Sequence, residues 1–161
     1  MEFITGTDET LKIGDTELSD LLAQVYVSGG FTTPEEAKSL FEPSAVKARG
    51  VLIGAREKEG LNLAGMIIIV PPDSPARRIA QENEAEIHLL GVRSDYRQHG
   101  LGRKLVVAAI DHANQNGYSK ITLWTQIPMR SAQKLYETMG FIHVENFERN
   151  GREFKLYELS L

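Results

Sequence analysis

The sequence predicts one α/β domain, α+β by some schemes, with a mixed and mostly antiparallel central sheet flanked by helices. Its 161 residues suffice for a single domain, residues 1–161, with a buried core, and are too few for two ordinary domains. In the second half, segments with the 3.6-residue period of helices alternate with short apolar segments typical of strands. Such an order is typical of helices packed against a sheet.

Two helices and then two strands are expected in the first half of the chain. The first helix carries its apolar residues on one face: Leu18, Leu21, Leu22 and Val25. A second helix begins after Thr33, because Thr33 suits the N-cap, Pro34 the first turn and Glu36 the capping box. The segments 50–57 and 63–72 have strand character and are joined by a short loop.

The second half begins with a polar, proline-bearing connection over residues 71–86, which we expect to be exposed and mobile. The following elements are predicted in this order: a strand over 85–92, a helix over 101–116, a strand over 120–126, a helix over 131–141, and two strands around the turn 149–152. The exposed final strand is a candidate surface for a homodimer.

The composition excludes several classes of function. The formal net charge is −4, whereas general nucleic-acid binding needs a basic face. The chain has no cysteine, which excludes disulfides, thiolate catalysis and cysteine zinc sites, and no histidine has a partner at metal-ligand spacing, so no metal is expected. No apolar run approaches the length of a membrane span, and the polar N-terminus is unlike a secretory signal. We therefore expect a cytoplasmic protein that binds neither membrane nor nucleic acid.

The turn between the strand 85–92 and the following helix suggests an anion site. Gly100 and Gly102 lie between Arg97 and Arg103, directly before the helix. Free backbone amides at a helix start attract phosphate, and glycine lets a phosphate approach closely. The glycines would also suit a tight turn without a ligand. The spacing fits neither the dinucleotide fingerprint, since Leu105 occupies the third glycine position, nor the P-loop.

Two motifs resemble the GNAT N-acetyltransferases. The first is the R-x-x-G-x-G pattern of Arg97, Gly100 and Gly102 after an apolar strand. The second, about thirty residues later, resembles the family's A-x-x-L-Y-E-x-x-G-F element, with these residues: Ala132, Leu135, Tyr136, Glu137, Gly140 and Phe141. The resemblance is strong over roughly residues 84–145, and before that only the order of elements fits.

The resemblance implies that acetyl-coenzyme A is the cosubstrate. The backbone at Leu90 and Val92 would pair with the pantetheine arm, although both side chains also suit a core. The pyrophosphate loop would comprise Arg97, Gln98, His99, Gly100, Leu101 and Gly102. Arg103 would reach a phosphate or remain an exposed residue of the helix start, and Ala132 is assigned to the same coenzyme site.

The resemblance also implies two catalytic residues. Tyr136 would protonate the leaving thiolate, or else pack on the sheet. Glu86 would serve as the base that deprotonates the amine, or else be a solvated carboxylate beside other acidic residues. His88, on the same strand face as Glu86, and water are alternative bases. Met129 departs from the family pattern, because members often carry an asparagine seven residues before the tyrosine.

The resemblance therefore implies transfer of an acetyl group to a primary amine, by direct attack through a tetrahedral intermediate. The acceptor would be a small molecule or a peptide, contacted by residues 26–31, the connection after residue 70 and the terminal hairpin. Glu35, Glu36 and Glu42 would attract a cationic amine or form a solvated helix face. The alternatives are a non-catalytic acyl-coenzyme A-binding regulatory module and another nucleotide-phosphate protein. The latter leaves the second motif unexplained.

Overall fold

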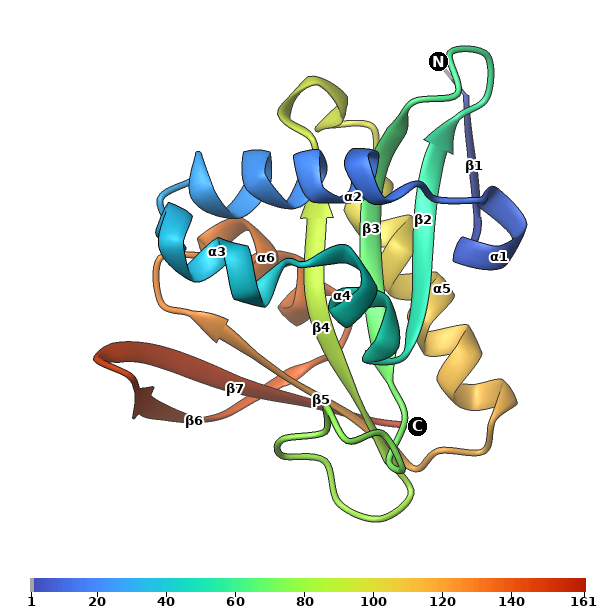
Figure 1. Ribbon diagram of the computed structural model, residues 1–161. Coiled ribbons are helices and arrows are strands. Elements are labelled where there is room, and N and C mark those ends of the chain that lie inside the picture. The colour runs from blue at the N-terminus through green and yellow to red at the C-terminus, as the bar shows by residue number, and fades with distance from the viewer. Residues whose placement is uncertain (1) are drawn as a thin grey trace.

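A seven-stranded sheet organises the computed structural model, which describes residues 2–161 (Figure 1). The strand order is β1-β2-β3-β4-β5-β7-β6, and only the pair β4–β5 is parallel. The bounds are Phe3–Thr7 for β1, Val51–Glu57 for β2, Leu63–Val70 for β3, Glu84–Val92 for β4, Lys120–Gln126 for β5, Ile142–Arg149 for β6 and Arg152–Ser160 for β7. The predicted mixed, mostly antiparallel sheet is confirmed.

Helices cover both faces of the sheet (Figure 1). One face carries α1 (Asp8–Leu11), α2 (Asp15–Leu22) with its π-helical extension η1 (Ala23–Val27), α3 (Pro34–Leu40) and α4 (Pro43–Ala48). The other face carries α5 (Leu101–Gln115) and α6 (Arg130–Thr138), and a 3₁₀ turn, η2 (Ser94–Tyr96), precedes α5. Thr33 caps α3 in the predicted capping box, which explains why that helix begins where the sequence indicated.

Three elements were not expected from the sequence: β1, α1 and α4. The strand β1 is short and half polar, and α4 depends on a local cap in which the Glu42 carboxylate accepts the amides of Ser44 and Ala45. The expectation that the final strand is an exposed edge is wrong, because β7 lies between β5 and β6. The edge strand at this end of the sheet is β6, where Ile142 is 70% exposed.

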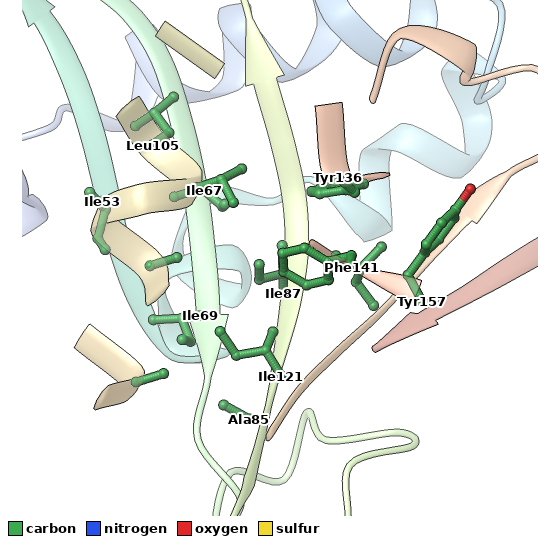
Figure 2. Close-up of a cluster of buried hydrophobic side chains, with 14 of the residues drawn as sticks. Ile53, Ile67, Ile69, Ala85, Ile87, Leu105, Ile121, Tyr136, Phe141 and Tyr157 are labelled. Carbon is green, nitrogen blue, oxygen red and sulfur yellow. The ribbon is translucent and has the colours of Figure 1, made fainter. Parts of the chain in front are cut away.

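The sheet separates two hydrophobic cores. The strand β3 is buried along its whole length and contributes to both, with Ile67 and Ile69 facing α5 and Met66 and Ile68 facing α2 and α4. Figure 2 shows the first core, in which Leu105 of α5 lies on one side and an aromatic cluster on the other. These cores fix the helices against the sheet around β4, where the cavities described below open.

A β-bulge interrupts β4. Leu89 has a left-handed φ of 57°, and two residues of β4 lie opposite one residue of β3 at this point. Before the bulge, Ala85 and Ile87 pack on the α5 side, and after it Leu90 and Val92 do so. Glu86 and His88 therefore face α2–α4, whereas Leu90 faces the opposite side. In the part of the chain that the structure describes, β4 pairs with β5 only over residues 84–86 and 120–122, so the two strands diverge beyond the pairing.

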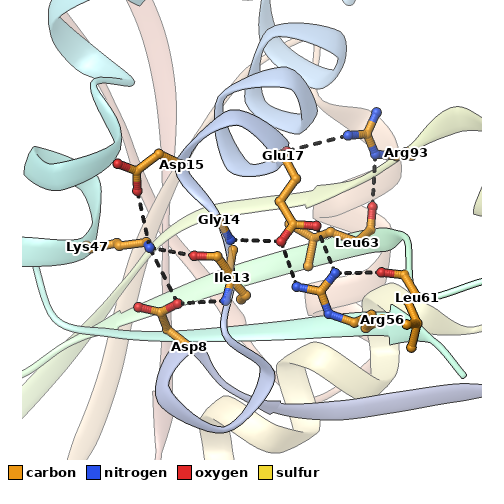
Figure 3. A network of polar contacts seen from close by, with 10 residues as sticks. All are labelled: Asp8, Ile13, Gly14, Asp15, Glu17, Lys47, Arg56, Leu61, Leu63 and Arg93. Carbon is orange, nitrogen blue, oxygen red and sulfur yellow. Dashed lines mark hydrogen bonds and ion pairs between the residues drawn. The ribbon is translucent and has the colours of Figure 1, made fainter.

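A network of polar contacts attaches the first helices to the sheet (Figure 3). Lys47 contacts the carboxylates of Asp8 and Asp15 and donates to the Ile13 carbonyl. Arg56 of β2 binds Glu17 of α2 at 2.7 Å, and this bond lowers the pKa of Glu17 despite partial burial. These contacts hold α2, and with it the η1 residues that line the cavities, in one position over β2–β4.

Candidate active site

The first cavity, here the glycine-loop cavity, lies where the end of β4 meets the starts of α5 and α6, and has a volume of about 570 Å³. It is lined by every residue that the sequence assigned to coenzyme binding except His99: Leu90, Val92, Arg97, Gln98, Gly100, Leu101, Gly102, Arg103 and Ala132. The His99 ring instead lies against Phe3, with centroids 5.7 Å apart. The structure thus brings together residues from both sequence motifs.

The backbone of the loop 97–102 forms an anion nest. Gln98 has a φ of 66° and Gly100 a φ of 73°, so left-handed residues alternate with right-handed or extended ones. Within residues 2–161, no backbone acceptor is found for the amides from Gln98 to Arg103, and the first bonded amide of α5 is that of Lys104. These free donors at the positive end of a 15-residue helix suit a pyrophosphate.

Arginines flank the nest. Arg97 is exposed and its Nε donates to the Val92 carbonyl at 3.3 Å, which holds the side chain beside the cavity. Arg103 is exposed on the first turn of α5 and lines the same cavity. Gly102 has a further role, since a β-carbon there would lie 3.1 Å from Leu135 Cδ2 of α6. The loop therefore combines an anion site with close helix packing.

A second cavity of about 410 Å³, here the arginine cavity, opens on the α3 side of the sheet between β4 and the β6–β7 hairpin. Its wall includes His88, Trp124 and four arginines: Arg49, Arg78, Arg149 and Arg152. Tyr26 and Met129 line both cavities, so the two spaces adjoin at these residues. The Tyr26 hydroxyl donates to the Leu90 carbonyl at 3.0 Å, directly after the bulge of β4.

Glu86 is buried beneath the arginine cavity with only 1% of its surface exposed. Its Oε1 accepts the amides of Arg78, Ile79 and Ala80, and its Oε2 lies 2.7 Å from His88 Nε2. Burial raises the pKa of Glu86, but the hydrogen bonds from His88 and these three amides outweigh it and lower the pKa to about 2. At neutral pH Glu86 is thus an ionised anchor for the connection 71–83, rather than a solvated carboxylate.

His88 lies between this anchor and the cavity. Because the ionised Glu86 carboxylate can only accept, His88 Nε2 donates the proton of their hydrogen bond, and Nδ1 is the ring nitrogen that this contact leaves free. In the described chain Nδ1 has no hydrogen-bond partner, and the side chain lines the arginine cavity. The predicted placement of Glu86 and His88 on one strand face is confirmed, and the pair has the geometry of a carboxylate-oriented histidine.

Tyr136 of α6 lies in the core on the α5 side, next to Phe141 and Tyr157, and is 3% exposed (Figure 2). It is not among the residues that line either cavity. Burial, and secondarily the neighbouring Tyr26 phenol, raise the pKa of Tyr136 above its ordinary range. The phenol is therefore protonated at all physiological pH values. Its neighbour Tyr26, unlike Tyr136, lines both cavities.

The comparisons with known proteins agree with this arrangement. The family model described as the acetyltransferase (GNAT) family matches residues 16–141, most of the chain and both sequence motifs. The chain belongs to the GNAT family of acetyltransferases. The nest, the divergence of β4 from β5 and the second motif are thus parts of a GNAT domain.

Individual relatives match this GNAT domain in part. N-alpha-acetyltransferase 30 of Saccharomyces cerevisiae is 40% identical over 74 residues, which are 44% of this chain and 42% of that protein. Mycothiol acetyltransferase of Kocuria rhizophila is 29% identical over 145 residues, 86% of this chain and 44% of that protein. The chain spans less than half the length of these curated relatives. One chain of a solved NatC complex bound to Gag peptide and CoA superposes on this chain with a TM-score of 0.72 at 24% identity. The match covers 100% of this chain and 99% of that chain.

Sequence reasoning did not identify several residues of the arginine cavity in this GNAT domain. Arg49, Trp124 and Arg149 come from three separate segments, and no spacing in the sequence relates them. Arg78 lies in a segment expected to shape the acceptor site, but the sequence marks it only as part of a polar connection. Over residues 2–161, no helix is both long and apolar enough to cross a membrane, and no three acidic or histidine side chains converge as a metal site would require.

Proposed function

We propose that this GNAT domain transfers the acetyl group of acetyl-coenzyme A to a primary amine. The observation that carries the proposal is the pair of adjoining cavities, one with an amide nest and one with a carboxylate-oriented histidine. Tyr26 and Met129 form their common wall, where the thioester of one ligand would meet the amine of the other. A non-catalytic acyl-coenzyme A sensor would need only the first cavity.

The coenzyme would bind mainly through backbone groups. The amides of residues 98–103 would hold the pyrophosphate, with Arg97 and Arg103 supplying charge and Gly100 allowing close approach. The pantetheine arm would run along Leu90–Val92, where β4 has left β5 and its edge is open to a ligand. Ala132, on the α6 side of the same cavity, would contact the arm across from β4.

The base would be the Glu86–His88 pair. An alkylammonium has a pKa near 10.4, so most of the amine must lose a proton before it can attack. A carboxylate with a pKa of about 2 is a weak proton acceptor, and its lone pairs are already engaged. Glu86 would therefore act through His88, whose Nδ1 takes the proton directly or through a water molecule. The role of Glu86 is then to orient and stabilise the histidine rather than to take the proton itself.

The transfer itself would be a direct attack. The amine nitrogen bonds to the thioester carbon, and a backbone amide near Leu90 or Val92 stabilises the oxygen of the tetrahedral intermediate. The carbon–sulfur bond then breaks and the sulfur leaves as a thiolate. Tyr136 is protonated because its pKa is raised, but it is buried and lines neither cavity, so its side chain would have to move towards the glycine-loop cavity to donate a proton or a hydrogen bond to that thiolate.

Two matched glycine variants test the coenzyme site. Gly100 and Gly117 have φ values of 73° and 72°, and neither has an atom within 4 Å of the position that a β-carbon would take. Valine at either site should therefore cost similar backbone strain, on the order of 1–2 kcal/mol. Only Gly100→Val should weaken binding of acetyl-coenzyme A in calorimetry, because only Gly100 borders the nest. Equal affinities for Gly100→Val and the parent would place the coenzyme elsewhere.

Release of the free thiol from acetyl-coenzyme A over a library of amines tests the reaction, with the acetylated product identified by mass spectrometry. Coenzyme binding without transfer to any amine would favour the sensor.

A further inference from the structure

The arginine cavity carries a local positive charge that the net charge of the chain conceals. Four arginines line it against one carboxylate, Glu36, and that carboxylate is paired with Arg152 at 2.9 Å. Among the described residues, Arg49, Arg78 and Arg149 form no ion pair. Three guanidinium groups from three segments thus face one space without a counter-ion.

These guanidinium groups are close enough to affect one another. Burial, and then the neighbouring Arg149, lower the pKa of Arg78, while Glu86 opposes this shift. Burial, and then Arg78, lower the pKa of Arg49. The carboxylate of Glu86 does not compensate them fully, since it is engaged by His88 and by backbone amides beneath the cavity. An anion bound between the arginines would relieve this repulsion.

The arginines are held in place before any ligand arrives. Arg78 and Arg149 lie over the Trp124 ring, with their guanidinium carbons 5.4 Å and 5.2 Å from its centroid. Phe147 stacks on the same tryptophan. Glu86 fixes the backbone of residue 78, and Arg49 donates to the Leu40 carbonyl at 2.7 Å. Side chains ordered in advance lose little entropy on binding, so the site is suited to recognition.

We propose that the acceptor is a primary amine that also bears a carboxylate, with the carboxylate bound by Arg49, Arg78 and Arg149 and the amine placed at His88. The planar fork of arginine matches a carboxylate through paired hydrogen bonds. His88 lines the same cavity, and its volume of about 410 Å³ suits a small molecule or the first residues of a peptide. Glu86 positions both ends of this site, because it binds His88 and the backbone of Arg78.

This inference rests on the proposed acetyl transfer and narrows its acceptor. It disfavours polyamines and other cationic amines, which the acidic residues of α3 had suggested as an alternative. Glu36, the α3 carboxylate at the cavity, is neutralised by Arg152 and leaves the other arginines free to bind an anion.

The test compares matched amines that differ in one carboxylate. Leucine and leucinamide, glutamate and glutamine, and amidated tripeptides with glutamate or glutamine at the second position serve as pairs, with putrescine as the cationic amine. In at least one pair, the carboxylate form should have about a tenfold or higher kcat/KM, the effect of a charge-assisted hydrogen bond. The pair that responds distinguishes a free amino acid from a peptide. Equal or better use of the amides or of putrescine would overturn the inference and leave acetyl transfer intact.

Two neighbouring arginines supply a matched variant and control. Arg78→Gln should raise KM for the carboxylate form and reduce the preference over its amide, whereas Arg77→Gln, outside the cavity, should leave the preference unchanged. Equal effects of the two variants would also overturn the inference. If no amine is acetylated, the proposed function fails separately. In that case, each pair of amines is titrated by calorimetry into the parent and into Arg78→Gln, both with coenzyme A bound. The inference requires that the parent bind the carboxylate form more tightly than Arg78→Gln does.

Discussion

The two cavities of this domain are built by different means. The anion nest of the glycine-loop cavity depends on the backbone of one contiguous segment, where free amides precede α5. The arginine cavity depends on side chains from α3, the residue after α4, the connection 71–83, β4, β5 and the β6–β7 hairpin. A backbone site tolerates most side-chain changes but few changes of conformation. A side-chain site has the opposite sensitivity, and its specificity can change one residue at a time.

The largest effect is expected from Tyr136→Phe, a core residue that lines neither cavity. Loss of the hydroxyl should lower kcat by about 10²–10⁴-fold if the phenol protonates the thiolate. Coenzyme affinity should change little, because the ring still packs against Phe141. Steady-state kinetics from pH 6 to 10 measure the effect. Tyr157→Phe, which removes a hydroxyl bonded to Glu137 in the same aromatic cluster, is the control and should keep its kcat. An unchanged kcat in Tyr136→Phe would make that tyrosine a packing residue.

Glu86→Gln tests how much the ionised carboxylate beneath the arginine cavity stabilises the protein. The pKa of about 2, against an ordinary value of 4.5, means that the ionised carboxylate stabilises the fold above about pH 4.5 and that this contribution disappears as the pH falls towards 2. The variant should therefore lose about 3 kcal/mol of stability at neutral pH and converge with the parent in acid. Denaturant unfolding at several pH values measures the difference.

The same variant tests the proposed base. Activity of Glu86→Gln should recover at high pH, where the amine deprotonates unaided. Glu84→Gln is the matched control on the same strand, since Glu84 also accepts an amide of the connection, that of Gln81, but does not contact His88. A loss of stability that persists unchanged at pH 3 would contradict the assigned ionisation of Glu86.

A smaller effect is expected in the glycine-loop cavity from Arg97→Ala. The guanidinium supplements the amides of the nest, so its removal should weaken coenzyme binding by about 1–3 kcal/mol. Stability should hardly change, because the side chain is exposed and donates one long bond to Val92. Calorimetry measures coenzyme affinity in Arg97→Ala and in the control Lys104→Ala. Lys104 is an exposed cation of the same helix start outside the cavity, so the comparison separates a direct contact from a general charge effect. Equal losses in both variants would argue against a direct phosphate contact.

The smallest effect should come from Gly102→Ala. Alanine favours the helix by up to about 1 kcal/mol, and the contact of 3.1 Å with the tip of Leu135 offsets part of that gain. The substitution should therefore change the free energy of unfolding, measured by thermal unfolding, by less than about 1 kcal/mol in either direction. A loss well above this range would show that α5 and α6 cannot adjust, and that Gly102 is needed for packing.

The two regions also differ in how well the sequence predicts them. The loop 97–102 and the element around Tyr136 are identifiable because contiguous glycines, arginines and an aromatic motif carry a local pattern. Burial of Glu86 could not be predicted, since the amides that bind it come from the preceding connection and their approach depends on tertiary structure. The bulge at Leu89 has no signal either, because leucine rarely adopts a left-handed conformation.

That bulge changes which layer the side chains of β4 face, so that its two ends no longer present alternate residues to the same layer. In uninterrupted β-structure, residues two apart share a face, so Glu86, His88 and Leu90 would all have faced the same layer. With Leu89 inserted, Glu86 and His88 of the proposed acceptor site face α2–α4, whereas Leu90 and Val92 of the proposed coenzyme site face α5. Substitutions of Glu86 or His88 therefore alter one layer, and substitutions of Leu90 or Val92 alter the other. A lineage that keeps this single irregular residue could exchange one proposed acceptor for another through changes around His88, while the proposed coenzyme contacts of Leu90 and Val92 stay constant.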